Sequence, residues 1–262
     1  QIGVEDTSYL IFAKGKKKQA LLVDEYIPFD YVSYDVEKLI SPSAGMIELY
    51  YQPNKPLNDG QKHYILYNQR FPENKPFAFD LSAPAIEALI TEQGSLRFSF
   101  FADAVEREQI TLEPGNWYKF TFSWDEVSIK IAINNKPVAK APRKTKSGTI
   151  GQKLYIGSRQ QLSYIEKKRE YKSRVVYHPE MEPAFCAAGY YDELKIIGPD
   201  DKTVLSVPFD GNLVDASGRQ GHRIRIAYRS APALADLDGD GKKDLIAPGG
   251  NINRAEGDFH LL

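Results

Sequence analysis

The sequence predicts an all-β protein built as an antiparallel β-sandwich, and three observations lead to this fold class. Short stretches alternate between apolar and polar residues with the period of a half-buried strand, and clusters of Gly, Pro and Asn separate them. Tyrosine is abundant, at 16 of 262 residues, and aromatic residues favour strands. Only a single stretch has helical spacing. Many short strands with almost no helix are typical of a sandwich or a barrel.

The first expected element is a hairpin. Residues 8–13 are apolar and strand-like, residues 15–18 carry a glycine and three lysines that suit a solvated turn, and Gln19 to Val23 form the returning strand. The apolar run from Tyr9 to Phe12 is expected at a sheet edge, where it could pair with another copy of the chain. Self-association through edge strands is therefore one expected interaction.

Further strands follow through the centre of the chain. They are expected at residues 45–51, 63–68, 95–101, 116–124, 127–133, 154–157 and 190–197. Within 116–124 the alternation places Tyr118, Phe120, Phe122 and Trp124 on one face. Trp117 opens this regular strand, and we interpret it as a core residue rather than as a ligand platform.

Two apolar stretches have other interpretations. A short helix is expected from Ala83 to Glu92, where Pro84 precedes Ile86, Leu89 and Ile90 at helical spacing. This helix would pack on a sheet edge. Cys186 is the only cysteine, so it forms no intrachain disulfide, and its apolar neighbours indicate a core thiol.

Composition excludes several classes of partner. The chain carries 34 basic and 35 acidic residues, for a net charge of −1, so it has no field that attracts nucleic acid or an anionic membrane. No apolar run approaches the ~20 residues that a membrane-spanning helix needs. We therefore expect no nucleic-acid partner and no membrane span. Hydrophobic residues make up 42% of the chain, which is enough for a sizeable core.

Three stretches together resemble the laminin G-like and concanavalin A-like jelly rolls. They are Gly45 to Pro53, then Gly115 to Asp125 with the strand and the Asn134-Asn135 turn after it, and finally Leu154 to Ser158 closed by Gly189 to Ile196. The match covers about residues 20–215. The resemblance implies a jelly-roll sandwich over residues 1–215, followed by a linker and a short appendage over residues 216–262.

The segment from Val207 to Gly218 also resembles this family. It is similar to a phrase that is common near the start of such jelly rolls, but it lies late in this chain. Two interpretations stay open. The segment is either a permuted closing strand of the same sandwich or the beginning of a second, truncated unit.

Catalysis is not expected. Glycan-cleaving relatives of this fold carry the pattern Glu-x-Asp-x-x-Glu on one strand face, as acid/base work requires, and this pattern is absent. Glu87 and Glu92 have no aspartate between them. Asp192 and Glu193 are adjacent, so a regular strand points them to opposite faces, and we expect a structural role for both. The histidines form no metal-type pair: His63, His178, His222 and His260.

Residues 236–244 hold the sharpest motif. Aspartates at positions 1, 3, 5 and 9 of a tight loop can converge on one hard cation, together with a backbone carbonyl, which is calcium chemistry. The expected Ca²⁺ ligands are Asp236, Asp238, Asp240, Lys242 and Asp244. An EF-hand needs glutamate where Ala247 stands, and the flanks are strand-like, so the loop resembles the calcium loop of an FG-GAP-type repeat. The alternative is a solvated acidic turn without an ion.

A long charged segment, Arg159 to Pro183, lies between two expected strands. We interpret it as a loop, and loops of this length are usually functional or mobile. Aromatic and arginine side chains are common energetic anchors of interfaces. The candidate ligand-binding residues are Tyr164, Arg169, Tyr171, Arg174 and Tyr177. A mobile loop that binds nothing is the alternative.

These observations favour a non-catalytic binding module of an extracellular or cell-surface protein. Its expected partner is a glycan or an extracellular protein, and Ca²⁺ is its expected cofactor. Part of this inference is fold analogy. Two alternatives stay open, which are an accessory region of a polysaccharide-degrading enzyme and a structural subunit of a surface fibre.

Overall fold

The computed structural model describes residues 12–23, 29–68, 84–146, 148–157, 163–171, 174–182, 186–226, 233–235, 244–248 and 259–261. Every regular element in these ranges is a strand, which confirms the all-β fold class, and within them no helix could cross a membrane. The chain divides into two compact units, described separately below. They are Gln1–Gln161 with Ala184–Arg225, and Leu162–Pro183 with Ile226–Leu262.

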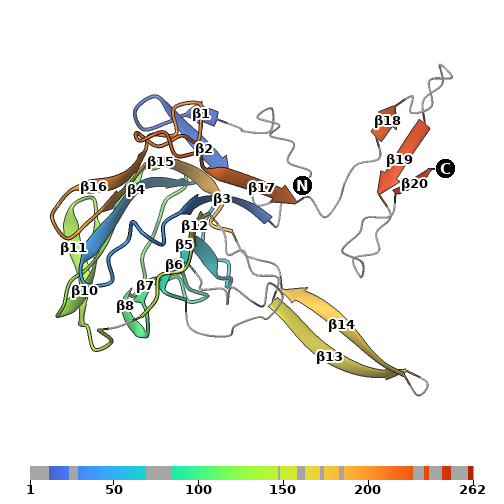
Figure 1. The fold of residues 1–262 in the computed structure, drawn as a ribbon, viewed down its shortest axis with the longest axis horizontal. Coiled ribbons are helices and arrows are strands. Elements are labelled where there is room, and N and C mark those ends of the chain that lie inside the picture. Colours follow the sequence, from blue (N-terminus) through green and yellow to red (C-terminus); the bar gives the residue numbers. More distant parts are fainter. Residues whose placement is uncertain are drawn as a thin grey trace. The chain divides into compact units, whose positions relative to one another are not determined.

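The first unit is a sandwich of two antiparallel sheets (Figure 1). The strands of sheet A are β1 (Phe12–Lys14), β2 (Gln19–Val23), β4 (Gly45–Pro53), β9 (Tyr118–Trp124), β10 (Ser128–Ile133), β11 (Lys136–Pro142), β15 (Gly189–Ile197) and β16 (Thr203–Val207). Their order in the described residues is β1-β2-β15-β4-β9-β10-β11, with β16 paired to β15. Pairing of Phe12 with Leu21 confirms the N-terminal hairpin, whereas the expected edge residues 9–11 lie outside the described ranges.

Sheet B forms the second layer of the sandwich. Its strands are β3 (Phe29–Asp35), β5 (His63–Asn68), β6 (Ile86–Ile90), β7 (Leu96–Phe100), β8 (Asp103–Arg107), β12 (Lys153–Ile156) and β17 (His222–Ile226). In the described part of the chain their order is β17-β3-β12-β5-β6-β7-β8. Several neighbouring strands come from distant parts of the sequence, so this sheet forms only through long-range strand pairing.

The core lies between the facing sides of the two sheets. Aromatic rings from both sheets meet there: the centroids of Phe98 and Phe122 are 5.2 Å apart, and those of Phe100 and Trp124 are 4.5 Å apart. Burial of this apolar surface is the main force that holds the layers together. Cys186 belongs to the same buried cluster, which confirms the expected core thiol.

The expected helix at residues 83–92 is wrong. Its described part contains β6, which pairs with β5 and β7. Ile86, Ala88 and Ile90 face the core, while Leu89 is only 4% exposed on the opposite side. A strand that is buried on both faces loses the period of two, so its apolar spacing is easily taken for that of a helix.

Trp117 is not a core residue. It precedes β9 and is partly exposed, whereas Trp124 at the end of this strand is 2% exposed and fills the core. The expected inward row is otherwise confirmed, because Phe120 and Phe122 are fully buried. The interpretation of Trp117 failed because it rested on the position of the residue in the strand and not on the face that alternation gives it.

The segment from Val207 to Gly218 closes the same sandwich. After β16, Phe209 and Leu213 are 1% and 2% exposed in the common core, and the Tyr34 hydroxyl donates to the Leu213 carbonyl at 3.0 Å. β17 then joins sheet B beside β3. The segment therefore packs as part of the first unit, which extends to Arg225.

The second unit contains two small sheets. One is the hairpin of β13 (Ser163–Tyr171) and β14 (Arg174–Glu182), and the other consists of β18 (Ala233–Ala235), β19 (Asp244–Pro248) and β20 (Phe259–Leu261). The expected loop at residues 159–183 is thus wrong over its described part. Tyr, Ile and Val favour strands, but here they are interspersed with many charged residues. Neither side of the hairpin is therefore apolar in the sequence, and the alternation that indicates a strand is missing.

Candidate functional site

The outer side of sheet A is accessible to solvent. Core-facing residues of β15, β4 and β9 alternate with partly exposed ones, as the burial along each strand shows. We call the accessible set the open face, and it consists of Tyr190, Lys195, Glu48, Tyr50, Gln52, Trp117, Lys119 and Thr121. It combines three aromatic residues with amide, hydroxyl and charged groups, a composition typical of recognition surfaces.

Each charged group of the open face has an ion-pair partner on the face or beside it. The Lys119 ammonium lies 2.7 Å from the Glu48 carboxylate, which also accepts a hydrogen bond from the Thr121 hydroxyl at 3.2 Å. Lys195 lies 4.0 Å from Glu193. The face therefore offers aromatic and amide groups within a surface that has little net charge.

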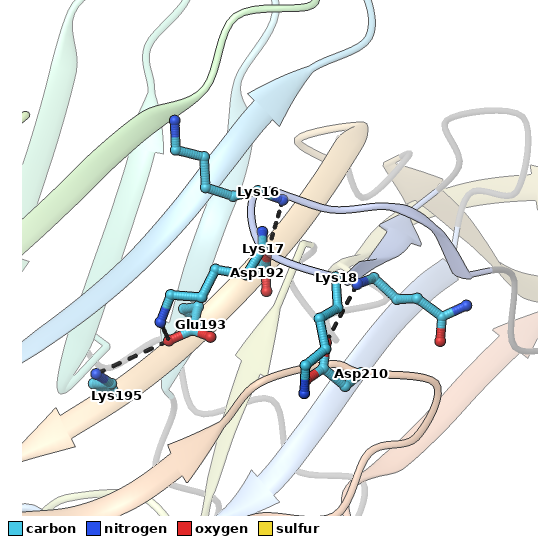
Figure 2. Close-up of polar contacts among 8 residues, drawn as sticks. Lys16, Lys17, Lys18, Asp192, Glu193, Lys195 and Asp210 are labelled. Carbon is cyan, nitrogen blue, oxygen red and sulfur yellow. Dashed lines mark hydrogen bonds and ion pairs between the residues drawn. The ribbon is translucent and has the colours of Figure 1, made fainter.

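Beside the open face, the turn between β1 and β2 is anchored to β15 (Figure 2). The backbone N–H groups of Lys16 and Lys17 donate to Asp192 Oδ2 at 2.8 and 3.3 Å. Figure 2 also shows the Lys17 ammonium against Glu193, at 2.8 Å, and Lys18 against Asp210, at 3.0 Å. Burial raises the pKa of Asp210, but hydrogen bonds donated by Lys18 and by a backbone N–H outweigh burial and hold this pKa below its usual value. The lysine run is thus the expected turn, held by carboxylates.

Asp192 has the structural role expected from the sequence. Asp192 is fully buried, and its Oδ1 atom has no hydrogen-bond partner among the described residues. Burial raises the pKa of Asp192 above its ordinary value, and the two donated backbone hydrogen bonds oppose this rise. Glu193 follows at a bulge, with a φ of 50°, so the bulge rather than regular alternation sets its direction. Asp192 and Glu193 are therefore not arranged as a catalytic pair of carboxylates.

The outer side of sheet B also carries tyrosines, but it is buried. Tyr155 pairs with Tyr67 across β12 and β5, and Tyr64 packs edge-on against Tyr67 with ring centroids 5.8 Å apart. These three rings stand outside the central core, and yet they are only 2–6% exposed. We call this set the shielded face, which consists of Tyr64, Tyr67, Leu89, Ser99 and Tyr155. A soluble ligand has no access to these rings.

The candidate ligand residues of the hairpin lie on its two strands. Tyr164, Arg169 and Tyr171 belong to β13, and Arg174 and Tyr177 belong to β14. Tyr171 pairs with Arg174, while Lys168 pairs with Tyr177. Because paired positions share a side and neighbours alternate, the register assigns positions 169, 171 and 174 to one side of the hairpin and positions 164 and 177 to the other.

The expected calcium loop falls almost wholly outside the described residues. Asp236, Asp238, Asp240 and Lys242 are not described, and Asp244 begins β19. The strand-like flanks are confirmed, since Ala235 pairs with Asp244 and β18 with β19. Among the described residues, no three His, Cys, Asp or Glu residues gather as a metal site would require.

The buried histidine of sheet B has a structural contact on each ring nitrogen. His63 Nδ1 lies 3.0 Å from the Cys186 carbonyl oxygen, and Nε2 lies 2.8 Å from the Asp59 carboxylate. Because the carbonyl can only accept, Nδ1 carries a proton. Glu87 lies within β6, and Glu92 follows the end of this strand, where it lies 3.8 Å from Lys62.

No protein-family model matches the chain, and no curated protein matches it. Domain 4 of AbnA, an extracellular arabinanase from Geobacillus stearothermophilus solved with arabinotriose, is 15% identical, with 71% of this chain and 74% of that chain covered and a TM-score of 0.45. Domains LG4-5 of the mouse laminin alpha1 chain are 10% identical, with 87% and 54% covered and a TM-score of 0.47. A putative carbohydrate binding protein from Bacteroides ovatus is 14% identical, with 75% and 57% covered and a TM-score of 0.46. The chain spans about half the length of the laminin pair, and these likenesses concern the fold alone.

The sequence interpretation missed the open face as a candidate site. Tyr190 was placed in a strand, and Gln52 lay in the Gly45 to Pro53 stretch that carries the family resemblance, but neither was singled out. The period-two signal that could have found them is present, because each lies next to a core-facing tyrosine, Tyr191 and Tyr51. Aromatic residues at both inward and outward positions obscured this signal.

Proposed function

We propose that this chain is a non-catalytic binding module of an extracellular or cell-surface protein, which recognises a glycan or a protein ligand and is stabilised by calcium. One observation carries the proposal, which is the hairpin of two nine-residue strands that forms a two-stranded sheet of its own. An isolated two-stranded hairpin is marginally stable in water. Contact with a ligand would supply the burial that such a hairpin lacks.

The composition of the hairpin supports recognition. Positions 169, 171 and 174 combine two arginines with a tyrosine on one side, and residue types of this kind are enriched where binding energy concentrates. In the sandwich, Asp192 instead accepts backbone N–H groups, and Glu48 is paired with Lys119. This distribution favours binding over acid/base chemistry.

Calcium is proposed to order the C-terminal part of the second unit. Ala235 pairs with Asp244 where β18 meets β19, so in the sequence the aspartates of the motif lie between, or at the start of, two paired strands. Oxygen ligands in such a segment suit Ca²⁺. The ion would act as a structural staple and not as a catalyst.

A screen against immobilised polysaccharides and extracellular proteins, with calcium and with chelator, tests the proposal. Wild type should bind at least one ligand without turnover. Replacing residues 163–182 by a short Gly/Ser linker should weaken the strongest ligand by at least about tenfold and leave the melting temperature of the sandwich nearly unchanged.

Point variants on the hairpin sharpen the result. Tyr171→Ala and Arg174→Ala should lose binding, while Lys168→Ala, on the other side of the same hairpin, serves as the matched control. Unchanged binding after hairpin replacement would refute the role of the hairpin. Turnover of a polysaccharide by the isolated chain would favour the enzyme alternative.

A further inference from the structure

A strip of three side chains crosses the open face. Tyr190 of β15 pairs in register with Gln52 of β4. Trp117 precedes Tyr118, which pairs with Tyr51, so continuation of this register sets Trp117 beside Gln52. All three residues of the strip are partly exposed. Because neighbouring strands lie about 4.8 Å apart, the two aromatic residues stand roughly 9–10 Å from each other, with the amide between them.

The backbone around the strip is fixed at both ends. A Cβ atom at Gly189 would collide with the Gln52 carbonyl, so this glycine permits the close approach of β15 to β4. Gln52 Nε2 donates to the Gly115 carbonyl, and the Gly115 N–H donates to the Pro53 carbonyl at 2.9 Å. These bonds hold the chain that carries Trp117 alongside β4. The strip is therefore preorganised, which lowers the entropic cost of binding.

The strip also keeps hydrogen-bonding capacity. Within the described ranges, neither the Trp117 indole N–H nor the Tyr190 hydroxyl has a hydrogen-bond partner. The Gln52 amide group uses Nε2 toward the backbone, which leaves its oxygen to accept. The nearest charges are paired, as Lys119 with Glu48 at 2.7 Å shows. The ligand that complements these groups has apolar ring faces, many hydroxyls and no net charge.

We propose that Trp117, Gln52 and Tyr190 form a platform for a neutral, linear β-1,4-linked glycan. Two sugar rings stack on the indole and phenol rings, and hydroxyl groups between them bond to the Gln52 amide. A straight, flat glycan chain matches a strip that runs straight across three strands. This inference rests on the proposed function for the class of ligand and adds a site on the sandwich itself.

The two tryptophans of the chain make the test direct. Trp124 is 2% exposed and donates its indole N–H to the Ser41 carbonyl at 2.9 Å, so acrylamide quenching of the fluorescence reports chiefly on Trp117. The probes are cellohexaose, xylohexaose and mannohexaose, with a β-1,4-linked hexamannuronate as the charged counterpart. A neutral hexasaccharide should protect Trp117 from acrylamide in a saturable way, and the charged chain should not.

Variants then assign the site. Trp117→Ala and Tyr190→Ala should each weaken hexasaccharide binding, measured by calorimetry, by roughly tenfold, whereas Trp117→Phe should retain most of the affinity because it keeps a ring. Val127→Ala is the control, since Val127 is 70% exposed on the turn between β9 and β10. Circular dichroism and melting curves establish that each variant is folded.

The outcomes separate this inference from the proposed function. Hexasaccharide binding that needs both aromatic residues, and survives replacement of the hairpin, supports the platform. If no hexasaccharide protects Trp117, or if the alanine variants bind as wild type does, the platform is refuted. If in that case a ligand from the wider screen still depends on the hairpin, the proposed function stands without the platform.

Discussion

Tyrosines occupy the outer sides of both sheets, but their surroundings differ. On sheet A, Tyr190 and Tyr50 are partly exposed and stand among paired charges. On sheet B, Tyr67 and Tyr155 are each 2% exposed. The same residue type is therefore accessible to solvent on one face and packed away from it on the other. Access to solvent, rather than composition, decides which face can bind a ligand.

Truncation of one tyrosine on each face should have the largest effect on stability. Tyr67→Ala should lower the free energy of unfolding by about 3 kcal/mol because it leaves a cavity at a buried ring, whereas Tyr190→Ala should lower it by less than about 1 kcal/mol because a partly exposed ring loses few contacts. Urea denaturation measures both values. Equal losses would show that the two faces do not differ in burial.

The proposed calcium response provides a second comparison, because none of residues 236–244 belongs to the open face or to the shielded face. Without an ion, the carboxylates of residues 236–244 are expected to repel one another, and calcium would remove this repulsion. Because calcium would bind only the folded state, it should stabilise that state by ~2.7 kcal/mol at a hundredfold excess over its dissociation constant. Calcium should raise the melting temperature of the second unit, chelator should lower it, and magnesium should substitute poorly.

The controls for calcium lie in the loop itself. Asp236→Ala or Asp240→Ala should remove most of the calcium response, and the acrylamide accessibility of Trp117 on the open face should stay the same with and without the ion. Melting curves that are indifferent to calcium and chelator alike would show that the loop is a solvated acidic turn.

The smallest effect concerns Asp192 at the border of the open face. Its folded pKa is raised by burial, so its contribution to stability is fully present below the unfolded pKa, near 3.9, and is lost as pH rises through the folded pKa. Asp192→Asn keeps an acceptor for the two backbone N–H groups and cannot ionise. The stability of this variant relative to wild type should therefore increase from pH 4 to pH 7.

Urea titrations at both pH values measure this difference. Other carboxylates, such as Asp125 and Asp215, have lowered pKa values and destabilise both proteins in acid, so their contribution cancels in the comparison. A difference that stays constant, or that shrinks as pH rises, would contradict the account of Asp192.

Local patterns predicted much of the fold. The inward row of Phe120, Phe122 and Trp124 follows from period-two alternation, and the turn at residues 15–18 follows from its glycine and lysines. The strand β6 was missed because burial on both faces removes that alternation. The hairpin β13–β14 was missed because a sheet without an apolar face gives no periodic signal.

The candidate site was less predictable than the fold. Trp117 was identified as notable but was placed in the core, although its neighbour Tyr118 already occupied the inward position of the alternation. The accessibility of Tyr190, in contrast to Tyr67, depends on what covers each sheet, and no local pattern records this. A sequence can place residues on one face, but only tertiary structure decides whether that face is exposed.

Chemical labelling of the tyrosines measures the difference in accessibility between the two faces. Native protein is treated with limiting tetranitromethane, and the nitrated positions are quantified by mass spectrometry over time. The account predicts early nitration of Tyr190 and Tyr50 on the open face, with Tyr67 and Tyr155 protected until urea unfolds the sandwich. Nitration of Tyr67 or Tyr155 as fast as that of Tyr190 in the native protein would contradict it.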